Sequence, residues 1–307
     1  MIKDYADRMP ITENLLLVNL TQSLAKTGSE YLRLDFRDAS GAISAFIFDH
    51  LSEFSDLDIG KVYQVDGFVK KYKDNLSLVI SQIDETSDDP RDYQFSLDLD
   101  FNSMQETIEQ EIMSLQSPQL QTLTLSIYQK YKDQFINQPA AKQVHHNFQG
   151  GLLYHTFSML STAKALLPLR PHLNADVIKA AIILHDMGKC VELTGDVSVE
   201  YTNVGKLIGH ISILDGEIYL LAHELNYDIN DGELLHLRHI LLSHHGREEW
   251  GSPVKPQTEE ALFVHMIDQF DATMQIAAQS TCTPNSSWTE KLWALDNRQL
   301  FKFENGR

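Results

Sequence analysis

An adjacent histidine and aspartate end an apolar run in the middle of this chain. The run extends from Ile182 to Leu184 and leads into His185, Asp186 and, three residues later, Lys189. Core packing does not explain the pair, because an ionised Asp at the end of a buried helix is costly unless it is paired or bound to a metal. One imidazole nitrogen and one carboxylate oxygen are ligands that suit Mn, Fe, Zn or Mg. We therefore interpret the pair as the centre of a metal site.

Five further side chains of the same ligand types lie in the second half of the chain, where most of the 13 histidines occur. They are His155, His210, His244, His245 and Asp268. They fall on separate predicted helices, as metal sites in helical bundles require. A single His on an apolar helix is more often a core histidine held by one hydrogen bond, but chance does not readily give the whole series. Asp271, one helical turn beyond Asp268, either orients a ligand imidazole or replaces Asp268 as the ligand.

Composition narrows the class of protein. The chain has 307 residues, enough for two domains, and a net charge of −18. That charge argues against binding nucleic acid over the whole surface, but it permits a local basic groove and suits a protein that holds divalent cations. We expect neither a signal peptide nor a membrane span, because the first residues lack a basic start followed by an apolar run and no run approaches the roughly 18 apolar residues that span a membrane. Cys190 and Cys282 form no paired motif, so we expect buried thiols and a cytoplasmic protein. Since no apolar run is long enough to span a membrane, we expect no membrane partner.

The sequence pattern of residues 1–85 predicts a β domain. Leu32, Leu34 and Phe36 alternate with polar residues, and similar patterns predict five strands with a short helical connection, 51–58, between the third and fourth. This order resembles an OB-fold, a five-stranded barrel that often binds single-stranded nucleic acid. Near the last hairpin, phosphate contacts and base stacking could come from Lys70, Lys71 and Tyr72. Basic residues are also common near hairpins, and the barrel could be a structural module alone.

The pattern of the rest of the chain predicts helices. We expect an acidic linker and a leading helix over 86–117, an all-α domain over 118–280, and an irregular tail over 281–307 that packs on this domain through Trp288 and Trp293. An apolar stripe from 204 to 221 predicts one long helix with His210 beside it. The apolar segment 261–267 predicts a buried stretch of the last helix.

The ordered ligand series resembles the HD-domain metal-dependent phosphohydrolases, and its three histidines at 210, 244 and 245 resemble the members that hold two metals. The segments 145–155 and 243–253 are more specific. With the OB-like domain in front, they make nearly the whole chain similar to the YhaM-type 3′-to-5′ exoribonucleases. The resemblance implies a multidomain fold in which an N-terminal all-β OB-fold barrel precedes an all-α HD domain.

The resemblance also implies roles for individual residues. The basic metal site of the superfamily corresponds to His155, His185, Asp186 and Asp268, with Asp186 as the bridge between two metals. The added ligands for the second metal correspond to His210, His244 and His245, and Lys189 corresponds to a phosphate-contacting Lys. One departure is Tyr154, where related sequences often have Glu. Nitrogen-rich ligation favours Mn, Fe or Zn over Mg, and the resemblance points to two Mn²⁺ ions.

Two divalent ions would activate a water for attack on a phosphodiester and neutralise the developing charge. Arg247 could clamp a phosphate or pair with Glu248 on the surface, and His145 or His146 could protonate the leaving oxygen or cap a helix start. We therefore expect a 3′-to-5′ exonuclease acting on single-stranded RNA, with single-stranded DNA also open as a substrate. The alternatives are an HD phosphohydrolase of nucleotides or other small phosphorylated substrates with a regulatory barrel, and a nucleic-acid adaptor with a degenerate site. The sequence leaves the oligomeric state open, a homo-oligomer included.

Overall fold

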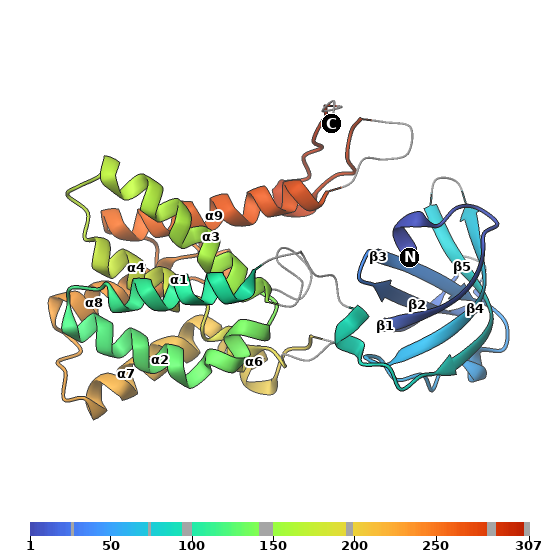
Figure 1. Cartoon of the computed structure of the whole chain (residues 1–307), viewed down its shortest axis with the longest axis horizontal. Coiled ribbons are helices and arrows are strands. Elements are labelled where there is room, and N and C mark those ends of the chain that lie inside the picture. Colours follow the sequence, from blue (N-terminus) through green and yellow to red (C-terminus); the bar gives the residue numbers. More distant parts are fainter. Residues whose placement is uncertain are drawn as a thin grey trace. The chain divides into compact units, whose positions relative to one another are not determined.

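The protein divides into two compact units, an N-terminal β unit and a helical unit (Figure 1). The computed structural model describes residues 1–25, 28–72, 75–93, 100–140, 150–194, 199–280 and 287–303. The division into two units confirms the multidomain architecture expected from the sequence. Among the described helices, none is both long enough and apolar enough to cross a membrane.

The β unit is a closed barrel with the strand order β1-β2-β3-β5-β4. Its strands are β1 (Pro10–Leu24), β2 (Glu30–Asp38), β3 (Gly41–Ile47), β4 (Val62–Tyr72) and β5 (Asn75–Glu85). Neighbouring strands are antiparallel except for the parallel pair β3 and β5. A 3-10 helix at Leu51–Glu53 lies in the connection between β3 and β4. All five predicted strands and the OB-fold topology are confirmed.

Alternation of side chains gives the barrel one apolar face and one solvent face. Leu32, Leu34 and Phe36 of β2 are buried, and in register they lie opposite Ile47, Ala45 and Ile43 of β3, which are also buried. Because successive side chains of a strand point to opposite faces, the residues between them must face outward. The exposed Arg33 of β2 and Phe46 of β3 are such residues, and they are register partners.

The helical unit contains seven longer helices among its described residues. They are α1 (Phe101–Met113), α2 (Pro118–Asn137), α3 (Gly151–Leu166), α4 (Ala175–Leu184), α7 (His210–Glu224), α8 (Gly232–Ser243) and α9 (Glu259–Gln279). Two shorter helices, α5 (Lys189–Glu192) and α6 (Asn203–Ile208), follow α4. The predicted cap of α4 is confirmed, since the Asn174 side chain accepts hydrogen bonds from the backbone N–H groups of Asp176 and Val177.

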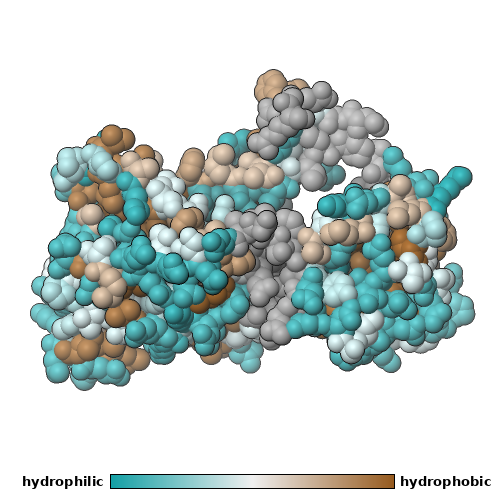
Figure 2. All heavy atoms as spheres, in the orientation of Figure 1, coloured by the Kyte–Doolittle hydropathy of each residue, from teal (hydrophilic) through white to brown (hydrophobic). Residues whose placement is uncertain are grey.

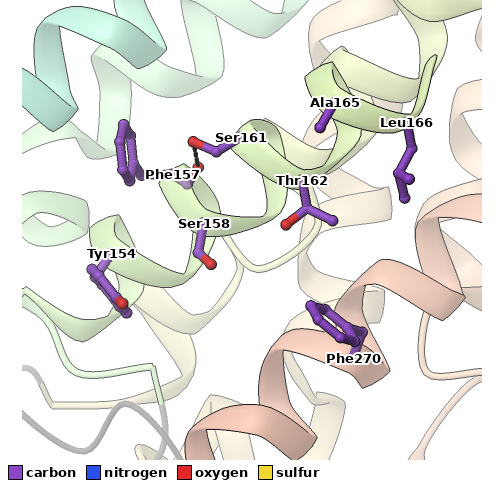
Figure 3. A pocket seen from close by; sticks show the side chains of 8 residues that line it. All are labelled: Tyr154, Phe157, Ser158, Ser161, Thr162, Ala165, Leu166 and Phe270. Atoms are coloured by element: carbon purple, nitrogen blue, oxygen red, sulfur yellow. Dashed lines mark hydrogen bonds between the residues drawn. The ribbon is translucent and has the colours of Figure 1, made fainter. Parts of the chain in front are cut away.

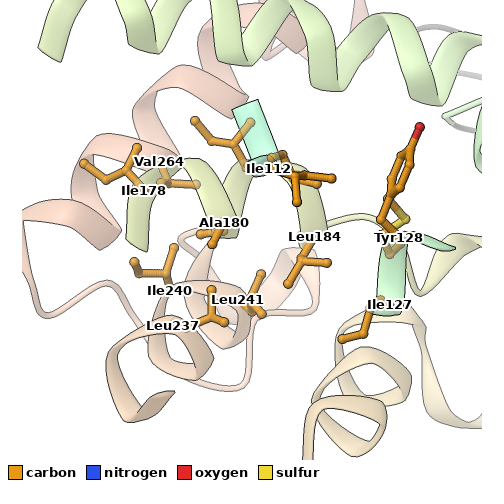
Figure 4. Close-up of a cluster of buried hydrophobic side chains, with 14 of the residues drawn as sticks. Ile112, Ile127, Tyr128, Ile178, Ala180, Leu184, Leu237, Ile240, Leu241 and Val264 are labelled. Atoms are coloured by element: carbon orange, nitrogen blue, oxygen red, sulfur yellow. The ribbon is translucent and has the colours of Figure 1, made fainter. Parts of the chain in front are cut away.

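Helix α4 is the centre of the helical core. From Val177 to Leu184 every residue except Lys179 is buried, and the helix packs against α1, α2, α3, α8 and α9 (Figure 4). A helix that is apolar nearly all round can only be stable inside a protein. Its C-terminal end therefore delivers His185 and Asp186 into the interior, where the surrounding helices can approach from several sides.

The prediction of a single long helix over 204–221 is wrong. The chain breaks at Gly209, which has a φ of 77° and separates α6 from α7. The apolar side chains before the break are exposed, with Leu207 at 82%, whereas Ile211 and Leu214 after it are buried. A glycine adopts this left-handed region without a steric penalty, so the chain can turn where the apolar stripe suggested continuity. The break places His210 at the first position of α7.

Two further expectations about burial are wrong. The segment 261–267 is not buried throughout, because Leu262 and Met266 lie on the outer face of α9. Trp288 and Trp293 of the tail are exposed, at 49% and 70%, while the smaller Leu295 is buried. Figure 2 shows hydrophobic side chains as separate brown patches on a largely hydrophilic surface. Cys190 is a free, partly buried thiol, and Cys282 lies outside the described residues.

Candidate metal centre

The structure brings all seven predicted metal ligands together. They come from α3 (His155), the residues directly after α4 (His185, Asp186), the start of α7 (His210), the residues directly after α8 (His244, His245) and the middle of α9 (Asp268). Two overlapping groups can each offer one ligand atom per residue within 4.8 Å of the others. Asp186 belongs to both groups and is the only residue that they share.

The first group consists of His155, His185 and Asp186, with Asp268 beside it. The Nε2 atoms of His155 and His185 are 3.2 Å apart, and His185 Nε2 is 3.3 Å from Asp186 Oδ2. Asp268 Oδ1 lies 3.3 Å from His155 Nε2. Neighbouring ligands bound about 2.1 Å from one ion lie roughly 3 to 3.4 Å apart. These separations therefore suit a shared divalent cation.

The second group consists of His210, His244, His245 and the other carboxylate oxygen of Asp186. Asp186 Oδ1 is 3.5 Å from His210 Nε2 and 4.0 Å from His244 Nε2. These three atoms are buried and have no hydrogen-bond partner among the described residues. Buried polar atoms are nearly always satisfied, so such a cluster of lone pairs needs an explanation. A cation bound between them would satisfy all three.

Three of the five imidazoles are oriented by backbone carbonyls. The Nδ1–H groups of His185, His244 and His245 donate to the carbonyl oxygens of Ile182 (2.8 Å), Leu241 (2.7 Å) and Trp250 (2.6 Å). A carbonyl can only accept, so these contacts assign the proton to Nδ1. The opposite nitrogen, Nε2, is then free to bind a cation.

The other two imidazoles are oriented by buried carboxylates. Asp271 Oδ2 lies 2.7 Å from His155 Nδ1, and Glu192 lies 3.1 Å from His210 Nδ1. Asp271 is therefore behind His155, whereas Asp268 faces its Nε2 on the side of the cluster. A carboxylate behind a ligand imidazole fixes the tautomer and makes the ligand nitrogen more basic.

Asp271 is itself held by a second side chain. Ser158 Oγ donates a hydrogen bond to Asp271 Oδ1. Ser158 also lines a hollow of about 490 Å³ formed by α3 with Phe270 of α9 (Figure 3). The hollow therefore lies on the side of His155 that faces away from the ligand cluster.

Electrostatics differ between the residues of the centre. Burial alone would raise the pKa of Asp186, but the charges of Lys189 and His185 override it and hold that pKa well below its usual range. Burial alone would lower the pKa of His155, but Asp268 and Asp271 override it and raise the pKa to about 9. Burial and the neighbouring His245 lower the pKa of His244 well below its ordinary value. The centre thus keeps Asp186 ionised and His244 neutral, the forms that bind metals.

Lys189 pairs with the shared carboxylate. Its buried Nζ donates to Asp186 Oδ2 at 2.7 Å. A lysine ammonium has three N–H donors, so the other two stay available to an incoming anion. Its predicted contact with phosphate is compatible with this position and stays a prediction.

Of the remaining predicted site residues, the structure describes Arg247, Lys70 and Lys71 in full. Arg247 lies just after the cluster and stacks on Trp250, and the expected surface pair with Glu248 is not among the described ion pairs. Lys70 and Lys71 are exposed on β4 of the other unit. The Tyr72 side chain, His145 and His146 lie outside what the structure describes.

A second group of candidate residues lies on the barrel and was missed in the sequence. Tyr31 of β2 stacks on Phe48, with ring centroids 5.4 Å apart, and contacts Phe46 at 6.2 Å. Phe46 and Phe48 are 43% and 55% exposed. The signal was available, because Phe46 occupies an outward position of the alternating pattern at 43–47 and Phe48 is the next outward position. We call these three rings the aromatic face.

Comparisons with known proteins agree with this geometry. Residues 17–86 match the sequence model of the OB-fold nucleic acid binding domain, and residues 152–273 match that of the HD domain. The chain joins an OB-fold domain to an HD domain. All seven candidate ligands lie inside the HD match. An HD domain implies a metal-dependent phosphohydrolase, and the OB-fold domain in front implies that its substrate is a nucleic acid.

Two solved structures are also similar to part of the chain. They are a crystal structure of a domain of replication protein A from Methanococcus maripaludis and a solution structure of the second OB-fold domain of the same protein. Each is 20% identical and covers 29% of this chain and 94% of its own, with TM-scores of 0.25 and 0.24.

Proposed function

We propose that this protein is a metal-dependent 3′-to-5′ exonuclease that hydrolyses the phosphodiester bonds of single-stranded RNA, with single-stranded DNA as a second substrate. The observation that carries the proposal is the pair of ligand groups that share Asp186 in the HD domain of a chain that also has an OB-fold domain. One carboxylate flanked by five imidazoles suits two divalent ions.

The proposed cofactor is two Mn²⁺ ions, because five of the seven candidate ligands are imidazoles and such sites favour Mn, Fe or Zn over Mg. Bound there, the ions would supply an activated water and neutralise charge on the phosphate. The chain itself holds Asp186 ionised and presents each Nε2 inward. Lys189, already beside Asp186, would place its remaining N–H donors on a phosphoryl oxygen, where negative charge develops during hydrolysis.

The aromatic face supports a nucleic-acid strand as the substrate. Successive bases can stack on exposed rings without regard to sequence, and each stack contributes about 1–3 kcal/mol. Tyr31, Phe46 and Phe48 offer such rings side by side, and the exposed Arg33 beside Phe46 could reach a phosphate. We retain Lys70, Lys71 and Tyr72, at the end of β4, as further proposed contacts of the strand.

The test is degradation of a 20-nucleotide single-stranded RNA labelled at its 5′ end, with Mn²⁺, in parallel with a panel of nucleotides and small phosphate esters. A ladder that shortens from the 3′ end, with release of mononucleotides and inhibition by a blocked 3′ end, is expected. Hydrolysis of the small esters with an intact oligonucleotide would contradict the proposal and favour a small-molecule phosphohydrolase.

The strand-binding part is tested separately. The double variant F46A/F48A should weaken binding of a single-stranded oligonucleotide by about 1–3 kcal/mol for each lost stack. Phe68→Ala is the matched control, because Phe68 is a similarly exposed phenylalanine on β4. Equal losses in the double variant and the control would show that the aromatic face has no special part in binding.

A further inference from the structure

The loop after α8 connects the metal centre to an exposed tryptophan. The Trp250 carbonyl accepts the hydrogen bond from Nδ1–H of His245, a candidate ligand. The Arg247 carbonyl accepts hydrogen bonds from the backbone N–H groups of Trp250 and Ser252. Gly246 at the start of the loop has a φ of 77°, and a Cβ there would lie 2.2 Å from the His265 ring. The loop is therefore closely fitted, and its backbone braces His245.

Two cations in this region, Arg247 and Lys255, have no acidic partner in the part of the chain that the structure describes. The Arg247 guanidinium lies over the Trp250 ring, 4.6 Å from its centroid. Although Glu248 and Glu249 follow in sequence, neither Arg247 nor Lys255 makes an ion pair with any residue that the structure describes. In a chain with a net charge of −18, two cations without an ion pair among the described residues are available to an anionic ligand.

The same residues enclose a space next to these cations. Arg247, Trp250 and Lys255 line a hollow of about 390 Å³ together with the exposed Glu248 and Glu249. Trp250 is 47% exposed, so the indole presents aromatic surface to solvent. Guanidinium, ammonium and indole are together the groups that recognise a phosphate joined to a flat ring.

We propose that the loop 246–252 with Lys255 is a nucleotide subsite, in which Trp250 stacks the base of the terminal nucleotide while Arg247 and Lys255 hold its phosphate. The assignment rests on the proposed function, since it gives the strand end a place on the loop that holds the candidate ligand His245. Glu248 and Glu249 also line the hollow, and their negative charges would disfavour ligands with several phosphates. The preferred occupant is a nucleoside monophosphate unit.

Binding of AMP and of ribose 5-phosphate to the full-length, Mn²⁺-loaded protein tests this assignment. Tryptophan fluorescence and calorimetry report binding, and chromatography checks that AMP is recovered intact. In the wild type, AMP should bind about 5- to 150-fold more tightly than ribose 5-phosphate, as expected for one base stack. Trp250→Leu should remove this difference in affinity by weakening the binding of AMP alone, whereas Trp250→Phe should retain most of the difference. Arg247→Ala should weaken both ligands.

Two controls keep the outcome specific. Trp293→Leu removes another exposed indole of the helical unit and should leave both affinities unchanged. Trp250→Leu keeps the backbone carbonyl that holds His245, so its Mn²⁺ content should equal that of the wild type. Unchanged AMP affinity in Trp250→Leu, or equal weakening of both ligands, would overturn the assignment. Failure of the wild type to shorten RNA would instead overturn the proposed exonuclease while leaving the AMP comparison to decide the subsite.

Discussion

The two halves of the candidate metal centre differ in how their buried polar atoms are compensated. In the half around His155 and His185, the polar atoms lie within reach of carboxylates, and His155 sits between Asp268 and Asp271. In the half around His210 and His244, buried nitrogens face Asp186 with no hydrogen-bond partner among the described residues. The first half can be held together by protonated histidine and carboxylates. Although Glu192 lies behind His210, the Nε2 atoms of the second half lack such compensation, so a cation contributes more to its stability.

Removing one imidazole from each half of the metal-free protein should have the largest effect on stability. His155→Ala leaves Asp268 and Asp271 without their buried partner, and the expected loss of unfolding free energy is about 3–5 kcal/mol. His245→Ala removes a half-buried ring with one hydrogen bond, and about 1 kcal/mol or less is expected. Urea unfolding measures both values. Equal losses would show that the halves do not differ in internal compensation.

A smaller effect is expected from the two carboxylates behind the ligands. Asp271→Asn and Glu192→Gln preserve shape but remove the charge that makes His155 and His210 better ligands. Each should weaken binding of one Mn²⁺ ion by roughly 10- to 100-fold. Titration of the metal-free variants should show one weakened and one unaltered site in each case. Weakening of the same site by both variants would contradict the division into two halves.

The smallest effect is a difference in pH dependence. In the metal-free protein the pKa of His155 is raised to about 9, so its stabilising contribution is complete below the unfolded value of about 6.5 and is lost as the pH rises through 9. The pKa values of His244 and His245 are lowered, so these residues destabilise the folded state as the pH falls below about 6.5.

Unfolding free energies measured from pH 5 to pH 10 check this difference. His155→Gln should reduce the loss of stability on the alkaline side, and His245→Ala should reduce it on the acidic side. Parallel curves for wild type and both variants would show that these histidines are not coupled to folding in this way.

Local patterns in the sequence predicted the parts of the molecule that depend on local structure. The alternation of apolar and polar residues in β2 and β3 predicted strands of the barrel. The apolar run of α4 predicted the helix that positions His185 and Asp186. The ordered ligand series predicted which helices must meet. Gly209 shows the limit, because an apolar stripe does not reveal whether a glycine within it adopts a left-handed conformation.

Partners that meet only in the folded protein were harder to foresee. Asp271 could be suspected, since it lies one turn from Asp268 on the same helix. Glu192 gave no signal, because its proximity to His210 depends on the chain turning back after α5. The contact of Trp250 with His245 likewise required the loop geometry.

The most direct test of the shared centre is anomalous scattering at the manganese edge from crystals grown with Mn²⁺, together with metal analysis of Asp186→Asn. Two peaks on either side of the Asp186 carboxylate are expected in the wild type. Loss of about 10³-fold in hydrolysis is expected in the variant, because both ions lose a ligand. A single peak that does not contact Asp186, or a variant with full activity, would contradict a two-metal centre bridged by this residue.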